Sequence, residues 1–118
     1  MQRSLQFYTQ VMGMKKNLEG AMYHGGVWVE LKSPHSSQRL ELNYYPPRSK
    51  FHEKFKTGSE LDHLAFWVTD VDKKYEQLVK RGAKRAIEPF RQGKYSFAFV
   101  KDPDGIWIEL IGRAKPRS

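Results

Sequence analysis

The stretch Phe97–Leu110 reads FAFVKDPDGIWIEL, two apolar runs on either side of a polar turn. In the centre, Asp102-Pro103-Asp104-Gly105 has the chemistry of a tight turn: proline fixes φ, aspartate bonds to nearby backbone groups, and glycine accepts a positive φ. The flanking runs alternate residue by residue between two side-chain faces, as strands do. The stretch therefore predicts a hairpin made of the strands Tyr95–Lys101 and Ile106–Gly112.

The second strand of this hairpin has a counterpart earlier in the chain. Ile108-Glu109-Leu110 is matched by Leu40-Glu41-Leu42, 68 residues before it, and the glycines that can end a helix, Gly13 and Gly82, lie 69 residues apart. A nearly constant offset for both a strand and a helix end indicates an internal repeat. Each copy runs helix, strand, strand, strand, and the second copy begins with one additional strand.

Periodicity supplies the other elements. Leu5, Tyr8 and Met12 have helical spacing, and a second helix is predicted between the N-cap Asp70 and Gly82. The other predicted strands are Lys15–Gly20, His24–Lys32, Gln38–Tyr45, Leu61–Thr69 and Ala83–Pro89. We therefore predict an α+β fold of two related halves, 1–45 and 61–112, with a linker at 46–60 and a basic tail at 113–118.

The first half lacks a partner for the strand that opens the second half. Applying the repeat offset to 61–68 places that partner upstream of Met1. An unpaired sheet edge is prone to associate with other chains. We therefore expect either that another segment covers this edge or that the sequence is a shortened form of a longer protein.

Composition restricts the partners. The chain has 118 residues, with 21 Lys and Arg against 13 Asp and Glu, so its net charge is +8. Such an excess favours anionic partners: nucleic acid, acidic lipid or a small acidic metabolite. The basic residues are spread along the chain, however, which is more typical of a solvated surface than of a nucleic-acid site. No run is long and apolar enough to span a membrane, and no secretory signal is recognisable. Zero cysteines exclude thiolate chemistry and suit a reducing cytoplasm.

Glu41 and Glu109 each lie between large apolar neighbours in their strands, and His63 lies at the start of a third strand. A carboxylate inside an apolar strand is costly to desolvate unless something pairs with it. Two solvated glutamates would be the simplest interpretation, but their equivalent repeat positions and a nearby histidine favour a common ligand. Imidazole and carboxylates suit a divalent transition metal such as Zn, Ni, Co, Mn or Fe.

Together these features resemble the glyoxalase I (lactoylglutathione lyase) branch of the vicinal oxygen chelate superfamily. The resemblance covers essentially the whole chain and rests on the segments Arg3–Tyr8, Gly13–Lys15, Leu40–Leu42, Asp62–Phe66 and Phe97–Leu110. It implies paired βαβββ modules forming a cupped mixed sheet around a metal, here without the first strand of module one. It also implies that Glu41, His63 and Glu109 hold Ni, Zn, Co or Mn, with a fourth ligand, His or Gln, on the absent strand.

The resemblance further implies a reaction. The hemithioacetal of methylglyoxal and glutathione would be isomerised through an enediolate to the 2-hydroxyacyl thioester, a cytoplasmic detoxification. Glu109 would act as the base that removes the carbon-bound proton, with Glu41 as its counterpart. The modules of one site often come from two subunits in this family, so a homodimer is implied, in which Glu41 of one chain meets His63 and Glu109 of the other.

Four residues are candidates for substrate binding: Lys94, Trp67, Trp107 and Tyr45. Lys94 resembles a basic residue that contacts glutathione in some relatives, although a solvated loop lysine would look the same. Relatives usually have Asn at the position of Tyr45, and this departure weakens the glutathione assignment more than the fold. The remaining histidines, His24, His35 and His52, match no ligand position and are expected on the surface.

Three alternatives stay open. Methylmalonyl-CoA epimerase uses the same scaffold and also removes a proton next to a carbonyl. Bleomycin-resistance-type proteins bind a ligand in a dimer cleft without metal or catalysis, and metal content distinguishes them from the enzymes. A nucleic-acid-binding module would need exposed aromatic residues on a basic face, whereas the aromatic residues here mostly follow core periodicities.

Overall fold

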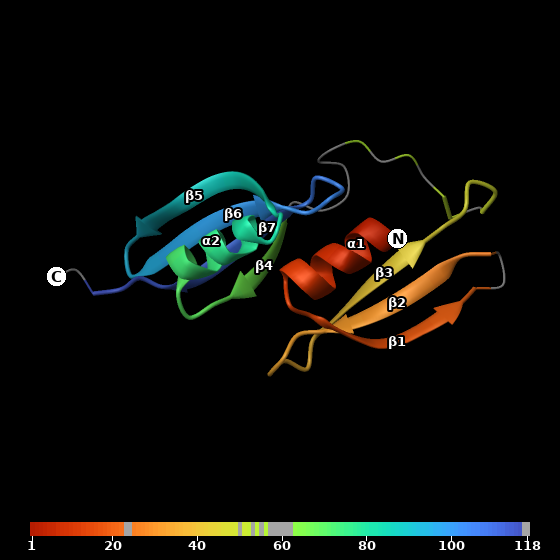
Figure 1. The fold of residues 1–118 in the computed structure, drawn as a ribbon, viewed down its shortest axis with the longest axis horizontal. Helices are drawn as coiled ribbons and strands as arrows, with labels where there is room; N and C mark the ends of the chain where they lie inside the picture. Colours follow the sequence, from red (N-terminus) through yellow and green to blue (C-terminus); the bar gives the residue numbers. More distant parts are fainter. Residues whose placement is uncertain (23–24, 50, 53, 55, 57–62, 117–118) are drawn as a thin grey trace. The chain divides into compact units, whose positions relative to one another are not determined.

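The structure, a computed structural model, describes residues 1–22, 25–49, 51–52, 54, 56 and 63–116 (Figure 1). The chain divides into two compact units, Met1–Phe55 and Lys56–Ser118. The boundary falls within the segment expected as a linker. No helix in the described ranges is long and apolar enough to cross a membrane.

The first unit is a short helix followed by an antiparallel sheet. Its elements are α1 (Gln2–Gln6), the π-helical turn η1 (Phe7–Val11), β1 (Lys15–Ala21), β2 (Val27–Lys32) and β3 (Arg39–Tyr44). The strands lie in the order β1-β2-β3. Among the described residues, β3 pairs with β2 alone, so its other edge has no strand beside it.

One helix was predicted up to Gly13, but the helix widens into a π turn after Gln6. The hydroxyl of Thr9 donates a hydrogen bond to the carbonyl of Leu5 at 2.7 Å, in competition with the Thr9 backbone N–H. Five residues apart, Met12 N donates to Phe7 O at 2.9 Å. The widened turn still buries Phe7, Tyr8 and Val11, which belong to the apolar core of this unit with Met14, Val29 and Leu31.

The second unit has the complete βαβββ order. Its elements are β4 (His63–Trp67), α2 (Val71–Lys80), β5 (Lys84–Gln92), β6 (Tyr95–Lys101) and β7 (Trp107–Arg113). The sheet order is β4-β7-β6-β5, in which β4 and β7 run parallel and the other pairs run antiparallel. The predicted α+β class is confirmed. The predicted strand Ala83–Pro89 is longer than expected, and positions 61 and 62 of Leu61–Thr69 lie outside the described residues.

Helix α2 begins and ends as its sequence predicts. The carboxylate of Asp70 accepts a hydrogen bond from Lys73 N at 3.1 Å and so caps the first turn. At the other end Gly82 has φ +107°, as the equivalent Gly13 has φ +78° after the first helix. The apolar stripe of α2, with Tyr75 and Leu78 almost fully buried, contacts β5, β6 and β7.

Helix α2 covers only one face of the second sheet. The side chains on that face are buried: Ala98, Val100, Ile108 and Leu110 are each 0% exposed. Strand alternation sends the neighbouring residues of β4, β6 and β7 to the other face, which no helix among the described residues of this unit covers. We call this second surface the open face, and it carries His63 and Glu109.

Candidate metal and substrate site

The open face consists of three rows of side chains that run across the strands. Cα pairing between β4, β7, β6 and β5 defines each row. The Glu109 row is Ala65, Glu109, Phe99 and Ile87. On one side of it lies the lysine row, His63, Trp107, Lys101 and Lys84. On the other side lies the aromatic row, Trp67, Ile111, Phe97 and Phe90.

His63 and Glu109 meet on this face. The Nε2 atom of His63 lies 3.1 Å from Oε2 of Glu109, and their side chains are 35% and 15% exposed. The two residues come from parallel neighbours, β4 and β7, where His63 is paired with Trp107 and Glu109 with Ala65. The alanine methyl opposite Glu109 leaves room for the imidazole to reach across the diagonal. Residues 46 positions apart in the chain therefore form one polar pair.

Aromatic rings border this pair. The ring of Phe99 makes edge contacts with His63 at 5.9 Å and with Trp107 at 5.7 Å, measured between ring centroids. These rings take the place of water around the carboxylate, which fits its low exposure. Electrostatic interactions strengthen in such partly dry surroundings, so a charge that approaches Glu109 would interact with it more strongly than at an open surface.

The pair fits two ligands of one metal ion. Imidazole nitrogen and carboxylate oxygen bind first-row divalent ions at about 2.0–2.2 Å. Bonds of that length give donor separations of about 3.0 Å for neighbouring octahedral positions and about 3.4 Å for tetrahedral ones. The observed separation of 3.1 Å lies in this range. Within the described parts of the chain, however, no group of three or more His, Asp or Glu side chains gathers as a metal site.

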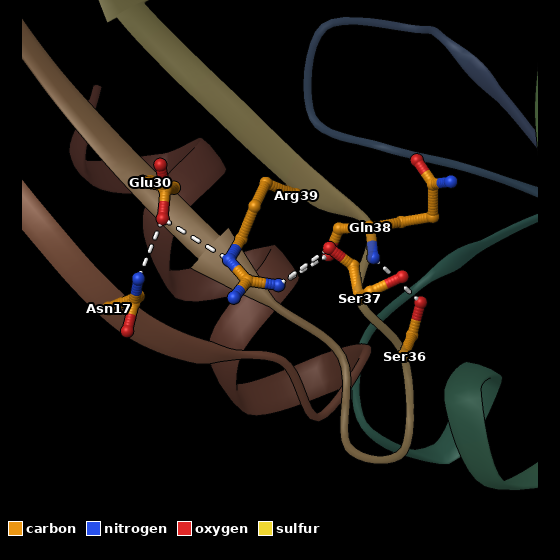
Figure 2. A network of polar contacts seen from close by, with 6 residues as sticks. All are labelled: Asn17, Glu30, Ser36, Ser37, Gln38 and Arg39. Carbon is orange, nitrogen blue, oxygen red and sulfur yellow. Dashed lines mark hydrogen bonds and ion pairs between the residues drawn. The ribbon is translucent and has the colours of Figure 1, made fainter.

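The third predicted ligand, Glu41, lies on β3 in the first unit. Its Cα partner across β2 is Glu30, so two carboxylates stand directly opposite each other. Glu30 is neutralised by Arg39 at 3.3 Å and accepts a hydrogen bond from Asn17 at 2.6 Å (Figure 2). Glu41 accepts a hydrogen bond from Asn43 at 3.0 Å, and no cation of the described residues forms an ion pair with it. Of the two carboxylates, Glu41 is therefore the one whose negative charge is not neutralised by a cation of the described residues.

The substrate-binding candidates are divided between the units. Trp67 and Trp107 both lie on the open face, and Trp67 is 61% exposed. Lys94 lies in the turn between β5 and β6, with Nζ 5.5 Å from the centroid of the Tyr95 ring. Tyr45 follows β3 in the first unit, where its ring lies 5.7 Å from Phe51.

The other histidines were expected on the surface and not as metal ligands. His52 Nδ1 lies 3.1 Å from the carbonyl of Tyr45, and His35 occupies a turn with φ +63°. His24 lies outside the described residues. Neither His35 nor His52 shares a strand with His63 or Glu109.

Sequence reasoning missed three residues of the open face. Phe97, Phe99 and Lys101 alternate along β6 on the same side as Glu109. The signal was present in the run FAFVK, because its first, third and fifth residues must share one face. The aromatic residues were expected mostly to follow core periodicities, whereas in this run only Ala98 and Val100 are buried.

A βαβββ unit with a histidine on its first strand and a glutamate on its last is the architecture expected of glyoxalase-like proteins. The sequence profile of the Glyoxalase/Bleomycin resistance protein/Dioxygenase superfamily matches residues 1–110. The match spans most of the chain, so this protein belongs to that superfamily.

Three comparisons show what the chain is similar to. The lactoylglutathione lyase of Escherichia coli O157:H7 is 32% identical over 116 residues, covering 94% of this chain and 83% of the relative. Glyoxalase I from Zea mays is similar in structure, with a TM-score of 0.76 at 29% identity over 97% of this chain and 41% of the maize chain. TnmS3, an antibiotic binding protein from Streptomyces sp. CB03234, has a TM-score of 0.74 at 21% identity, covers 96% of this chain and 86% of that protein, and shows the fold alone.

Proposed function

We propose that this protein is a metal-dependent lyase of the glyoxalase type. Its substrate would be the hemithioacetal of a 2-oxoaldehyde and a thiol, methylglyoxal and glutathione in the first instance, and its product the 2-hydroxyacyl thioester. The observation that supports the proposal most directly is the contact of His63 with Glu109 at 3.1 Å on an open sheet face. The similarity to lactoylglutathione lyases over 94% of the chain supports the choice of substrate.

His63 and Glu109 would hold the metal together with Glu41, and a fourth ligand would be His or Gln. Nickel, zinc, cobalt and manganese are all compatible with one imidazole and two carboxylates. Bound there, the ion would act as a Lewis acid toward the adjacent oxygens of the substrate. The histidine fixes the position of the Glu109 carboxylate through their contact at 3.1 Å.

Glu109 would carry the proton. Its carboxylate takes the proton from the carbon that bears sulfur, and the electron pair of that C–H bond moves to form the enediolate. The same carboxylate then returns the proton to the neighbouring carbon, which becomes the carbinol carbon of the product. The hydroxyl of the sulfur-bearing carbon gives up its proton as that carbon becomes the thioester carbonyl, and the oxygen on the neighbouring carbon gains one as it becomes the product hydroxyl. No atom is gained or lost, so the reaction is an isomerisation. Positioned proton transfer of this kind typically contributes about 10²–10⁴-fold to the rate.

The complete site would need two chains. In this proposal Glu41 of one subunit joins His63 and Glu109 of its partner in a homodimer, and Lys94, Trp67, Trp107 and Tyr45 contact the thiol part of the substrate. The chain has 21 basic and 13 acidic residues, and its net charge of +8 suits binding of the anionic hemithioacetal. A chain without cysteine suits the reducing cytoplasm, which is where we place the reaction.

The test follows thioester absorbance with methylglyoxal and glutathione. The purified protein is stripped with a chelator, dialysed, and assayed alone and after addition of Ni²⁺, Zn²⁺, Co²⁺ or Mn²⁺. We expect turnover to depend on an added ion and to be lost in both Glu41→Gln and Glu109→Gln. Equal rates in the stripped protein and the metal-loaded protein would contradict the proposal.

A second candidate is a ligand-binding protein without catalysis. It is favoured by the absence of a three-residue donor cluster in the described ranges, together with the fold similarity to TnmS3. Elemental analysis of the native protein separates the two functions. A stoichiometric transition metal supports the lyase, whereas metal-free protein that binds a ligand and shows no turnover with any added ion supports the binder.

A further inference from the structure

The open face changes character along the strands, from cationic to apolar. At the cationic end, Lys84 and Lys101 are direct Cα partners across β5 and β6. Like charges directly opposite each other repel. Among the described residues, no carboxylate lies within ion-pair distance of either lysine. Nζ of Lys101 lies 5.1 Å from the centroid of the Trp107 ring, beside His63 in the same row.

The apolar end is the aromatic row. The rings of Phe90 and Phe97 stack at a centroid distance of 5.6 Å, and Trp67 lies at the other side of the row. Phe90 is 43% exposed and Trp67 is 61% exposed. Exposed aromatic side chains gathered on one surface are typical of a binding site. A flat apolar group placed here would cover rings that water now contacts.

Glu109 lies midway between the two ends. Each row is two residues from the next along β6, which corresponds to about 6.6 Å of strand. The lysine row and the aromatic row are therefore about 13 Å apart, with the Glu109 row between them. A single small molecule can reach from one end to the other across the carboxylate.

We propose that the open face binds an amphiphilic anion in one fixed orientation. Its carboxylate, sulfonate or phosphate lies at Lys84 and Lys101, and its apolar group lies on Phe90 and Phe97. A ligand placed this way presents its central carbon to Glu109. As a statement about substrate class the inference rests on the proposed function, but the binding itself requires neither metal nor turnover.

Charge complementarity favours a small anion at the lysine pair. In the proposed dimer the partner contributes Glu41 at His63 and Glu109, and because each chain carries a net charge of +8, a ligand is the favoured source of negative charge for Lys84 and Lys101. A small anion relieves the repulsion between the lysines, and its apolar part covers the aromatic row. Lys101 and Phe90 are therefore assigned as the residues that select the two ends of the ligand.

The experiment uses a fluorescent carboxylic acid and its neutral methyl ester analogue. N-dansyl-4-aminobutyrate and its methyl ester share one fluorophore, which brightens in apolar surroundings, and differ only in charge. Each is titrated against the full chain at low salt. We expect the acid to bind at least 5-fold more tightly than the ester, with one molecule per chain.

Three variants locate the two ends. Lys101→Met keeps the aliphatic stem and should reduce the acid-to-ester preference at least 3-fold while the ester Kd stays the same. Lys73→Met removes the same charge from α2, which covers the opposite face of the sheet, and should leave the preference unchanged. Phe90→Ala, an exposed position on edge strand β5, should weaken acid and ester equally.

Several results would overturn the inference. They are an acid-to-ester preference near one, equal effects of Lys101→Met and Lys73→Met, or no effect of Phe90→Ala on either probe. The outcome is independent of the lyase assay. If the probes behave as expected and no turnover is found with any metal, the proposed reaction fails and the binding orientation stands. If turnover is found and the probes do not behave as expected, the proposed reaction stands and the binding orientation fails.

Discussion

Replacing Glu109 by glutamine isolates its role as a proton acceptor. Glutamine has the same shape, and its amide oxygen can still face His63, whose Nε2 lies 3.1 Å from the native carboxylate. The side chain is 15% exposed, so a substitution that preserves its volume should leave the surrounding rings in place. We therefore expect the free energy of unfolding to change by about 1 kcal/mol or less, the usual net value of one hydrogen bond.

The effect on turnover should be far larger. An amide cannot take up the carbon-bound proton, so kcat should fall by about 10²–10⁴-fold. Each factor of ten corresponds to about 1.36 kcal/mol, which gives about 2.7–5.4 kcal/mol of lost transition-state stabilisation. The contrast between a small stability change and a large kinetic change is the signature of a residue that contacts the reacting atoms.

The assay is the thioester absorbance at a series of metal concentrations, since the variant also loses a metal donor. Only kcat at saturating metal reports the proton transfer. Glu88→Gln is the matched control, because Glu88 lies on β5 of the same unit with a side chain that is 80% exposed. Retention of more than a third of kcat in E109Q at saturating metal would refute the assignment, and so would an equal loss in the control.

Three further predictions concern stability. Asp102→Ala should lower the free energy of unfolding by about 2–4 kcal/mol in urea titrations, because the buried carboxylate accepts backbone N–H bonds at 2.9 and 2.8 Å; a loss below 1 kcal/mol would count against it. Leu110→Ala, at a position 0% exposed, should cost about 2–5 kcal/mol, and a near-neutral result would contradict the packing assigned to β7. The Lys115 ammonium, 2.8 Å away, and the Lys73 N–H hold the pKa of Asp70 below its ordinary value. Stability from this pair is present above the ordinary pKa and is lost as pH falls through the lowered one. In Lys115→Met, carboxyl NMR should therefore show the pKa of Asp70 raised, with the stability deficit present at neutral pH and closing in acid; an unchanged pKa would be incompatible with the ion pair.

The pairing of His63 with Glu109 was within reach of the sequence. Alternation assigns each residue to a strand face, and the repeat assigns both strands to the same module. The helix cap and the hairpin turn were predictable from local residue chemistry. Asp70 caps α2, and the Asp102 carboxylate accepts hydrogen bonds from backbone N–H groups of its own turn. The cap and the turn depend only on residues close in the chain, whereas the pairing of His63 with Glu109 also requires that β4 and β7 be neighbours in the sheet.

Which of the two facing carboxylates, Glu30 or Glu41, forms the ion pair could not be predicted from the sequence, for a different reason. The role of Glu41 depends on which carboxylate is neutralised, and Glu30 lies opposite it only because β2 and β3 pair in one particular register. A slip of one residue would send every side chain of β3 to the other face. The ion pair of Glu30 with Arg39 is a consequence of that register and cannot be predicted from periodicity, and no cation in the described part of the chain forms an ion pair with Glu41.

Which residues of β5 lie on the open face also could not be predicted from periodicity. Strict alternation would place Lys84 and Phe90 on one face and Ile87 on the other, yet all three pair with residues of the open face. Two irregularities, between Arg85 and Ile87 and between Ile87 and Phe90, each change the side-chain parity of the strand. The second contains Pro89, which has no backbone N–H to donate and is tolerated on an edge strand. These irregularities bring Ile87 into the same surface as the lysine pair and the stacked phenylalanines, so they make the open face continuous between the two ends of the proposed ligand.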